Sequence, residues 1–359
     1  MAKALVVAGF LATGCGLASA QTTITADDPQ IVEGSKKEDG LLIYSNLADT
    51  NWKPLLETFR QHYPWIKVDT LNMGPDEAFT RYSVESGSGA RSADVLAVGS
   101  IQGWLAFLEK SKLLAYEPPE VKGLPAWSRV VPNLYAMSAD PMLIVYNKLL
   151  VPAADQPKSM ADIARLAATK PQDYARGFTT YDGLDQFGLS IHYSWLKAKG
   201  EEGWAELAKF GPLTVMESSG GNMLAKLTSG EVKIGYAVSA ITFFPRMGGA
   251  QDKLLGWTFP ADGTPLVVRG IGIPEKARNV NSAKLFENFV LSEEGQKALG
   301  RGGLAPYRPG IGKSDVKFES YDSIVERVGE KNIVLVNYTK EFLGEIPAYQ
   351  KRWKATVSP

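Results

Sequence analysis

The chain has 359 residues, 45% of them hydrophobic and 22% charged, which is ordinary for a globular protein of one large or two modest domains. Lys and Arg together number 39, as do Asp and Glu, so the formal net charge at pH 7 is zero. This balance excludes recognition of nucleic acid or anionic membranes through bulk charge, and we expect no nucleic-acid partner.

The N-terminus has the three parts of a secretory signal peptide. Lys3 precedes an apolar run at residues 4–12, too short for a membrane span, and Ala18-Ser19-Ala20 places small residues before a polar stretch. We predict cleavage after Ala20 and release into the periplasm, which leaves a mature chain without cysteine because Cys15 is the single one. The residues around Cys15 also resemble an imperfect lipoprotein box, so a lipid anchor at Cys15 is the alternative to soluble release.

Strand patterns alternate with helix patterns after a polar N-terminal extension at residues 21–40. The expected strands are residues 41–44, 66–71, 93–98, 142–146, 177–181, 213–216, 234–238 and 266–268. The expected helices are residues 52–63, 76–85, 104–108, 160–168, 191–199, 222–229, 282–291, 293–299 and 322–353. Such alternation predicts an α/β fold with mostly parallel sheets flanked by helices.

Strands that return after a second α/β block predict a discontinuous, two-lobed protein. The expected divisions are a signal peptide (residues 1–20), an N-terminal extension (21–40), lobe 1 (41–137), lobe 2 (138–262), the return of lobe 1 (263–310), and C-terminal helices that pack on lobe 2 (311–359). Ligands of such sheets bind outside the carboxyl ends of the strands, so we expect the loops there to face a shared cleft.

Small hydroxyl, amide and glycine residues follow several of these strands. Ser45-Asn46 ends the first expected strand, and Gly99-Ser100 ends the third. The segment 217–222, which reads Glu-Ser-Ser-Gly-Gly-Asn, opens a helix whose unpaired N–H groups and dipole favour an anion. Glycine there lets a ligand approach the backbone, and the serine hydroxyls add donors. The alternative is that Ser219 or Asn222 only caps the helix.

Other strand ends complete a predicted ligand site. Arg269 could clamp an oxyanion in bidentate fashion, although a salt bridge between the lobes would explain it equally well. Tyr181-Asp182 offers an aromatic wall and an acceptor. The predicted site consists of Ser45, Asn46, Ser100, Tyr181, Asp182, Glu217, Ser218, Ser219, Gly220, Ser239 and Arg269.

Catalytic motifs are scarce in the sequence. The two histidines, His62 and His192, are far apart, and a lone histidine makes neither a metal site nor a triad. Neither His-Glu-x-x-His nor Gly-x-Ser-x-Gly occurs. We therefore expect no catalytic residues, no cofactor and no resident metal.

Several motifs, taken in order, resemble the extracellular solute-binding proteins of ABC importers. They are Ala93-Asp94-Val95 with Gly99-Ser100, Tyr146-Asn147-Lys148, Ser229-Gly230-Glu231 and Leu291-Ser292-Glu293-Glu294-Gly295-Gln296. The most similar branch includes binders of ferric iron, phosphonates and sugar phosphates. The resemblance implies a type II-like periplasmic-binding fold whose hinge closes over its ligand, with crossings near residues 134–138 and 259–266. It also implies docking on a membrane permease coupled to an ATPase.

The resemblance also bears on the ligand. Ferric-iron members carry a tyrosine pair shortly after the segment that matches Gly230-Glu231, whereas this chain reads Ser-Ala-Ile-Thr-Phe-Phe at 239–244. Phenylalanine has no oxygen for a hard cation. We therefore predict a monomer that captures a small oxyanion-bearing solute, such as a phosphonate, a phosphate ester or a carboxylate. The alternatives are a metal bound with a bridging anion by Asp182, Glu217 and Tyr236, and a secreted enzyme that uses Glu217, Asp182 or His192.

Overall fold

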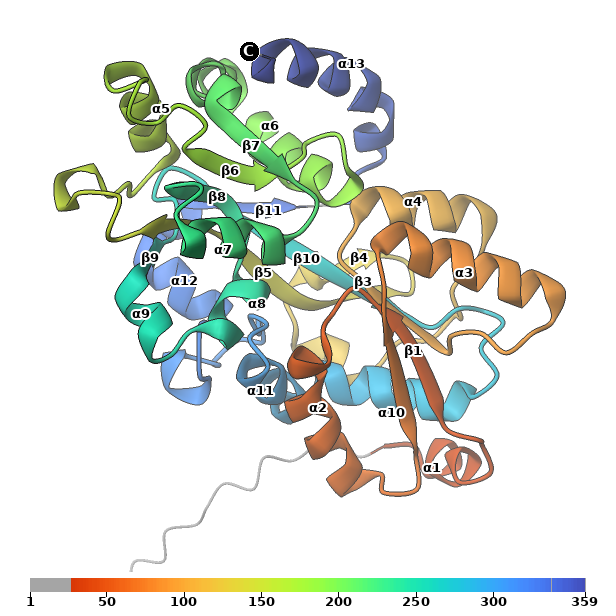
Figure 1. Cartoon of the computed structure of the whole chain (residues 1–359). Helices are drawn as coiled ribbons and strands as arrows, with labels where there is room; N and C mark the ends of the chain where they lie inside the picture. The colour runs from red at the N-terminus through yellow and green to blue at the C-terminus, as the bar shows by residue number, and fades with distance from the viewer. Residues whose placement is uncertain (1–26, 337, 359) are drawn as a thin grey trace, which may run out of the picture.

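The computed structural model describes residues 27–336 and 338–358, and Figure 1 shows their arrangement. The predicted signal peptide at residues 1–20, its Cys15, and the start of the N-terminal extension lie outside the described residues. Within the described part, no helix combines the length and hydrophobicity needed to cross a bilayer.

The strands and helices alternate along the chain as expected for an α/β protein. The strands are β1 (Leu41–Ser45), β2 (Val68–Asn72), β3 (Val95–Val98), β4 (Arg129–Val131), β5 (Leu134–Asn147), β6 (Phe178–Tyr181), β7 (Thr214–Glu217), β8 (Ile234–Ser239), β9 (Leu255–Thr258), β10 (Thr264–Gly272) and β11 (Ile333–Val336). The α-helices are α1 (Pro29–Ser35), α2 (Asp49–His62), α3 (Pro75–Ser88), α4 (Ile101–Lys110), α5 (Met160–Thr169), α6 (Gln186–Phe210), α7 (Gly220–Ser229), α8 (Ala240–Phe243), α9 (Ala250–Leu254), α10 (Val280–Leu291), α11 (Glu293–Arg301), α12 (Tyr321–Val328) and α13 (Lys340–Val357).

The strand order β2-β1-β3-β10-β5-β8-β6-β7 divides the molecule into two lobes. In the first lobe β2, β1 and β3 are parallel, and in the second lobe β8, β6 and β7 are parallel. The antiparallel strands β5 and β10 lie between these two sets and run through the middle of Figure 1. The predicted fold class, two lobes each with a mostly parallel sheet flanked by helices, is confirmed.

The connection between the lobes lies within the long strand β5. Its residues up to Pro141 pair with β10, and from Met142 onward they pair with β8 and β9. The change of partner therefore falls slightly after the segment 134–138 expected from the sequence. Two prolines stand at this crossing, because Pro141 faces Leu266 and the neighbouring Pro265 faces β11. Neither proline has an N–H for the ladder, so the sheet is less tightly bonded here than on either side.

Each lobe has its own apolar core, which keeps its strand ends in place. In the first lobe α2 packs on α11 and α1 packs on α10, with the Phe59 and Phe286 rings 5.1 Å apart. In the second lobe the Phe210 and Tyr236 rings lie 5.0 Å apart beneath α6. Helix α6 is longer than the expected 191–199, and it breaks at Gly200, whose φ of 60° only glycine adopts readily.

The prediction of a helical tail over residues 322–353 is wrong in its middle. Residues 333–336, Ile-Val-Leu-Val, form β11 and pair with Thr264–Val267 of β10 in parallel. Aliphatic and β-branched residues suit this half-buried strand, and β10 offers it a free hydrogen-bonding edge. The helix resumes as α13, which lies beside α6 at one end of the molecule in Figure 1, where Tyr193 and Lys197 contact Glu345. Helix α1 and the short strands β4 and β9 also went unpredicted.

Candidate ligand-binding cleft

A cleft of about 490 Å³ lies between the two lobes, at the carboxyl ends of strands from both. The first lobe lines it with Asn46, Ala48, Thr50, Asn51 and Asn72. The second lobe lines it with Ser219, Gly220, Gly221, Ile241, Thr242, Pro245 and Arg246. Most of the lining side chains are polar, Ala48, Ile241 and Pro245 are apolar, and one side chain is charged, the exposed guanidinium of Arg246.

Two helices begin at this cleft from opposite sides. Helix α2 follows Ala48, which supplies no side-chain cap, so its first N–H groups lack that partner. Helix α7 follows Ser219, whose Oγ accepts the Asn222 N–H at 3.2 Å while its own proton remains free to donate. The positive ends of both helix dipoles and several unpaired N–H groups therefore converge on one space. The exposed Asp49 in the first turn of α2 offsets part of this field.

Asn46 presents its amide as a donor because its carbonyl is already engaged. The Asn46 Oδ1 accepts the Gly99 N–H at 3.1 Å and a short hydrogen bond from Arg269 Nη1. Arg269 is only 1% exposed, and its Nε donates to Asp140 Oδ2 at 3.2 Å. Arg269 is thus not part of the lining. It does form a salt bridge, but with the neighbouring strand β5 rather than between the two lobes. Its side chain orients Asn46 rather than reaching the cleft itself.

Tyr181 supports the floor of the cleft from below. Its side chain is 6% exposed, and a Cβ placed on Gly220 would lie 2.5 Å from the Tyr181 Oη. Burial raises the pKa of Tyr181 to about 12, although the nearby Ser239 hydroxyl, Gly220 N–H and Thr242 hydroxyl lower it. The phenol therefore remains protonated at neutral pH. The first turn of α7 rests directly on it, which only glycine at position 220 allows.

The other predicted site residues lie away from the lining. Ser45 is buried and accepts Trp52 Nε1–H at 3.0 Å, and Ser218 is exposed. Ser100 caps α4 and donates to Gln186 Oε1 at 3.0 Å, so it joins the lobes outside the cleft.

Two acidic candidates after β6 and β7 have local partners. Asp182 Oδ1 accepts the Leu184 N–H at 2.9 Å, and Glu217 lies 3.2 Å from the Lys226 ammonium. Of the predicted residues, the structure brings Asn46, Ser219 and Gly220 to the cleft surface and Tyr181, Ser239 and Arg269 close behind it.

The sequence model of the bacterial extracellular solute-binding proteins matches residues 55–322, well over half of the chain. The chain belongs to this family. Members of this family are extracellular solute-binding proteins, so this chain is a periplasmic or secreted binding protein. No curated protein matches the chain significantly.

Solved structures of other binding proteins share the fold of this binding protein at low sequence identity. The substrate-binding protein of an ABC transporter from Agrobacterium tumefaciens is 18% identical with a TM-score of 0.77, and the match covers 89% of this chain and 96% of that one. Iron-bound HitA from Pseudomonas aeruginosa is 18% identical, with a TM-score of 0.67 and coverage of 88% and 99%. AfuA from Actinobacillus pleuropneumoniae, with fructose-6-phosphate bound, is 18% identical, with a TM-score of 0.63 and coverage of 89% and 98%.

Several residues that line the cleft of this binding protein were missed from the sequence. Asn72 ends β2, so the same strand-end reasoning could have found it. Thr242 and Arg246 follow β8 within a short helical stretch that was not expected. Asn51 lies inside α2, and its Nδ2 donates across the lobes to Ile241 O at 3.2 Å. No sequence pattern marks a residue that, like Asn51, lies inside a helix and contacts the opposite lobe.

The candidates for a metal site in the binding protein do not come together. Tyr236 is fully buried in the second lobe, where its hydroxyl donates to Thr214 Oγ1 at 3.2 Å. Asp182 and Glu217 have the partners given above. Among residues 27–336 and 338–358, no three His, Cys, Asp or Glu side chains are grouped as a metal site would require.

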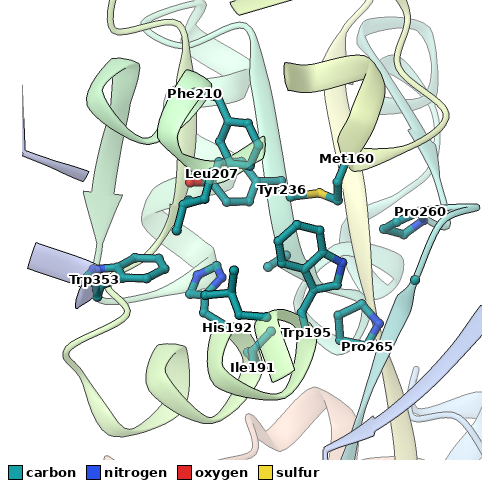
Figure 2. Close-up of a pocket in the computed structure, with 13 residues that line it drawn as sticks. Met160, Ile191, His192, Trp195, Leu207, Phe210, Tyr236, Pro260, Pro265 and Trp353 are labelled. Atoms are coloured by element: carbon teal, nitrogen blue, oxygen red, sulfur yellow. The ribbon is translucent and has the colours of Figure 1, made fainter. Parts of the chain in front are cut away.

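His192, the other candidate for chemistry, lies in the core of the binding protein's second lobe. Figure 2 shows it between Trp353 and Trp195, beside a small cavity of about 20 Å³, room for about one water molecule. Its Nε2–H donates to the Tyr181 carbonyl at 3.1 Å, and burial lowers its pKa from 6.5 to about 4. The imidazole is therefore neutral at pH 7 and holds the strand that carries Tyr181.

Replacing His192 with glutamine should remove part of the acid sensitivity of the fold. The unfolded histidine takes up a proton near pH 6.5 while the folded one resists it down to about pH 4, so stability falls as pH drops through this window. The wild type should lose about 2–3 kcal/mol more than His192→Gln between pH 7 and 4.5. Urea unfolding of both proteins at the two pH values measures this difference. If the wild type and His192→Gln lost the same free energy of unfolding between the two pH values, His192 would titrate normally in the fold.

Proposed function

We propose that this binding protein captures a small solute with an oxyanion group, a phosphonate, a phosphate ester or a carboxylate, and releases it unchanged to its permease. The observation that supports this most is the pair of helix N-termini, α2 and α7, that face one cleft. Backbone N–H groups at helix starts bind anions without any need for a full counter-charge. The Asn46 amide and the Arg246 guanidinium add donors from the two lobes.

The cleft lining favours an anion over a bare metal ion as the cargo. Ferric iron needs hard, preferably anionic oxygen ligands. The residues that line the cleft include no Asp, Glu, Tyr, His or Cys, and their side chains offer mainly N–H and O–H donors. The structural likeness to AfuA with fructose-6-phosphate is consistent with a phosphate ester, while HitA binds iron with the same fold. The chemistry of the lining, rather than the fold, is what supports an oxyanion over iron.

Capture would proceed by closure of the lobes about the β5 and β10 crossing. Solute bound first to one lobe would draw in donors of the other, because neither lobe alone surrounds the cleft. The contacts that already join the lobes, Ser100 with Gln186 and Asn51 with Ile241, lie at the edge of the same space or beyond it. Closure would then bury the oxyanion and present a single closed shape to the permease.

Arg246→Gln should weaken oxyanion binding about 10-fold, since a hydrogen bond to a charged group is lost. Isothermal titration with methyl phosphate, methylphosphonate and acetate, with methanol as the neutral probe, would measure this. The matched control is Arg165→Gln, an exposed arginine of α5 whose salt bridge is with Asp162, 3.3 Å away. Binding of methanol as tight as that of the anions, or an Arg246→Gln protein with wild-type affinities, would contradict the proposal.

A further inference from the structure

A second hollow of about 440 Å³ adjoins the cleft along the outer face of α7, and we call it the α7 groove. Helix α7 lines it with Gly221, Leu224, Ala225 and Thr228, which are spaced three, four and seven residues apart and so lie on one face. Phe243 and Met247 form the opposite wall. The groove therefore runs the length of the helix, starting at its N-terminal end.

The groove and the cleft share two residues and differ in chemistry. Gly221 and Arg246 line both hollows, so the two spaces meet at the first turn of α7. The cleft side offers amides, hydroxyls and helix N–H groups. The groove is lined mainly by hydrocarbon, from Leu224, Ala225, Phe243, Met247 and Leu255, and its polar lining residues besides Arg246 are Thr228, Ser229 and Gln251. One continuous site therefore has a polar end and an apolar end.

Arg246 stands at the junction and is held there from one side. Its Nη1 donates to the Thr242 carbonyl at 2.6 Å, and its Nη2 lies 4.0 Å from the position of a Cβ on Gly221. Gly221 carries no side chain that would close the passage beside the guanidinium. A ligand that reaches from the cleft into the groove would therefore need the exposed Arg246 side chain to turn aside, but no movement of the backbone.

We propose that the solute is a two-part molecule, with an oxyanion head in the cleft and a hydrocarbon tail of several carbons in the α7 groove. This rests on the proposed function, because it uses the same head-group site. The continuity at Gly221 and Arg246 is what assigns the groove to the tail. Each methylene that enters the groove should tighten binding, because apolar surface is removed from water.

Titration with a homologous series tests the tail. Methyl, butyl and octyl phosphate, with the matching phosphonates and carboxylates, should bind with increasing affinity, by up to about 4-fold for each added methylene that the groove takes up. Ala225→Trp, an exposed position on the groove wall, should abolish this gain with length and leave methyl phosphate, methylphosphonate or acetate binding unchanged. The matched control is Ala168→Trp, an exposed alanine of α5 in the same lobe, which should behave as wild type.

The outcomes separate the two proposals. Short anions that bind without any gain from a longer tail would overturn the tail and leave the proposed function standing. A gain with length that Ala225→Trp does not reduce would mean that the tail lies elsewhere, and the groove assignment would fail. If none of the three anion series binds, the proposed function fails, and the inference fails with it. Circular dichroism melting of both tryptophan variants establishes that they are folded.

Discussion

Replacing Arg269 with methionine should lower the free energy of unfolding by about 3–5 kcal/mol, the largest stability effect that we expect in this chain. Arg269 and Asp140 are each 1% exposed, and the guanidinium is the charged partner of the carboxylate. Without it, the Asp140 charge would keep only the Ala305 N–H and the Ser138 hydroxyl, at 3.1 and 3.0 Å. A buried charge that loses its counter-charge costs far more than the pair contributes.

The shift of the urea midpoint, followed by circular dichroism, measures this effect. The double variant Arg269→Met with Asp140→Asn is the control, because it removes the charge as well and should recover much of the loss. A single variant within about 1 kcal/mol of wild type would mean that the carboxylate is solvated or neutral in the fold. Because Arg269 orients Asn46, the folded single variant should also bind anions more weakly.

Replacing Gly220 with alanine should weaken oxyanion binding by about 10-fold or more, because the new methyl group cannot be accommodated where the first turn of α7 now lies. The added Cβ would be 2.5 Å from the Tyr181 Oη and 3.2 Å from the Thr242 Oγ1. Either the phenol or the helix start must move, and overpacking of this kind costs about 1–3 kcal/mol. Both groups belong to the cleft or its floor, so the donor geometry should change with them.

Isothermal titration with the tightest of the small anions above measures the loss. Gly87→Ala is the matched control, since it lies in α3 with nothing within 4 Å of the added carbon and should bind as wild type. Tyr181→Phe in the Gly220→Ala background removes the contacting oxygen and should restore part of the affinity. Unchanged binding by Gly220→Ala alone would show that the start of α7 is not part of the anion site.

Most of the architecture could be predicted from the sequence because hydrophobic periodicity is a local signal. The correctly predicted strands, such as β1, β3 and β8, are short runs of residues buried on both faces. The segment that was wrongly predicted as helical, β11, is aliphatic and lies between the helices α12 and α13. Its strand conformation depends on pairing with the free edge of β10. Pairing between residues so distant in the chain leaves no local trace.

The candidate site was predicted in part for the same reason. Strand-end position located Asn46, Ser219 and Gly220, because the topology of a parallel sheet fixes where such ends lie. Strand-end position could not tell a side chain that faces the cleft from one that lies behind it and supports it, such as Arg269. Nor could it recognise a side chain that is engaged by a local partner, such as Asp182. It also missed Asn51, which reaches the cleft from inside a helix. Those distinctions depend on side-chain direction and tertiary contacts.

The two-stranded crossing at Pro141 and Pro265 has a consequence for how reproducibly the lobes meet. A pair of antiparallel strands bends and twists readily but resists sliding, because sliding would break every remaining ladder bond at once. In the proposed closure, the lobes would therefore swing apart and together while Asn46 on one side of the cleft and Ser219 on the other keep the same lateral alignment. Each closure of the lobes would then bring the same donor groups to the same positions around the solute. Selection among solutes would therefore depend on their chemistry and not on how the lobes happen to align.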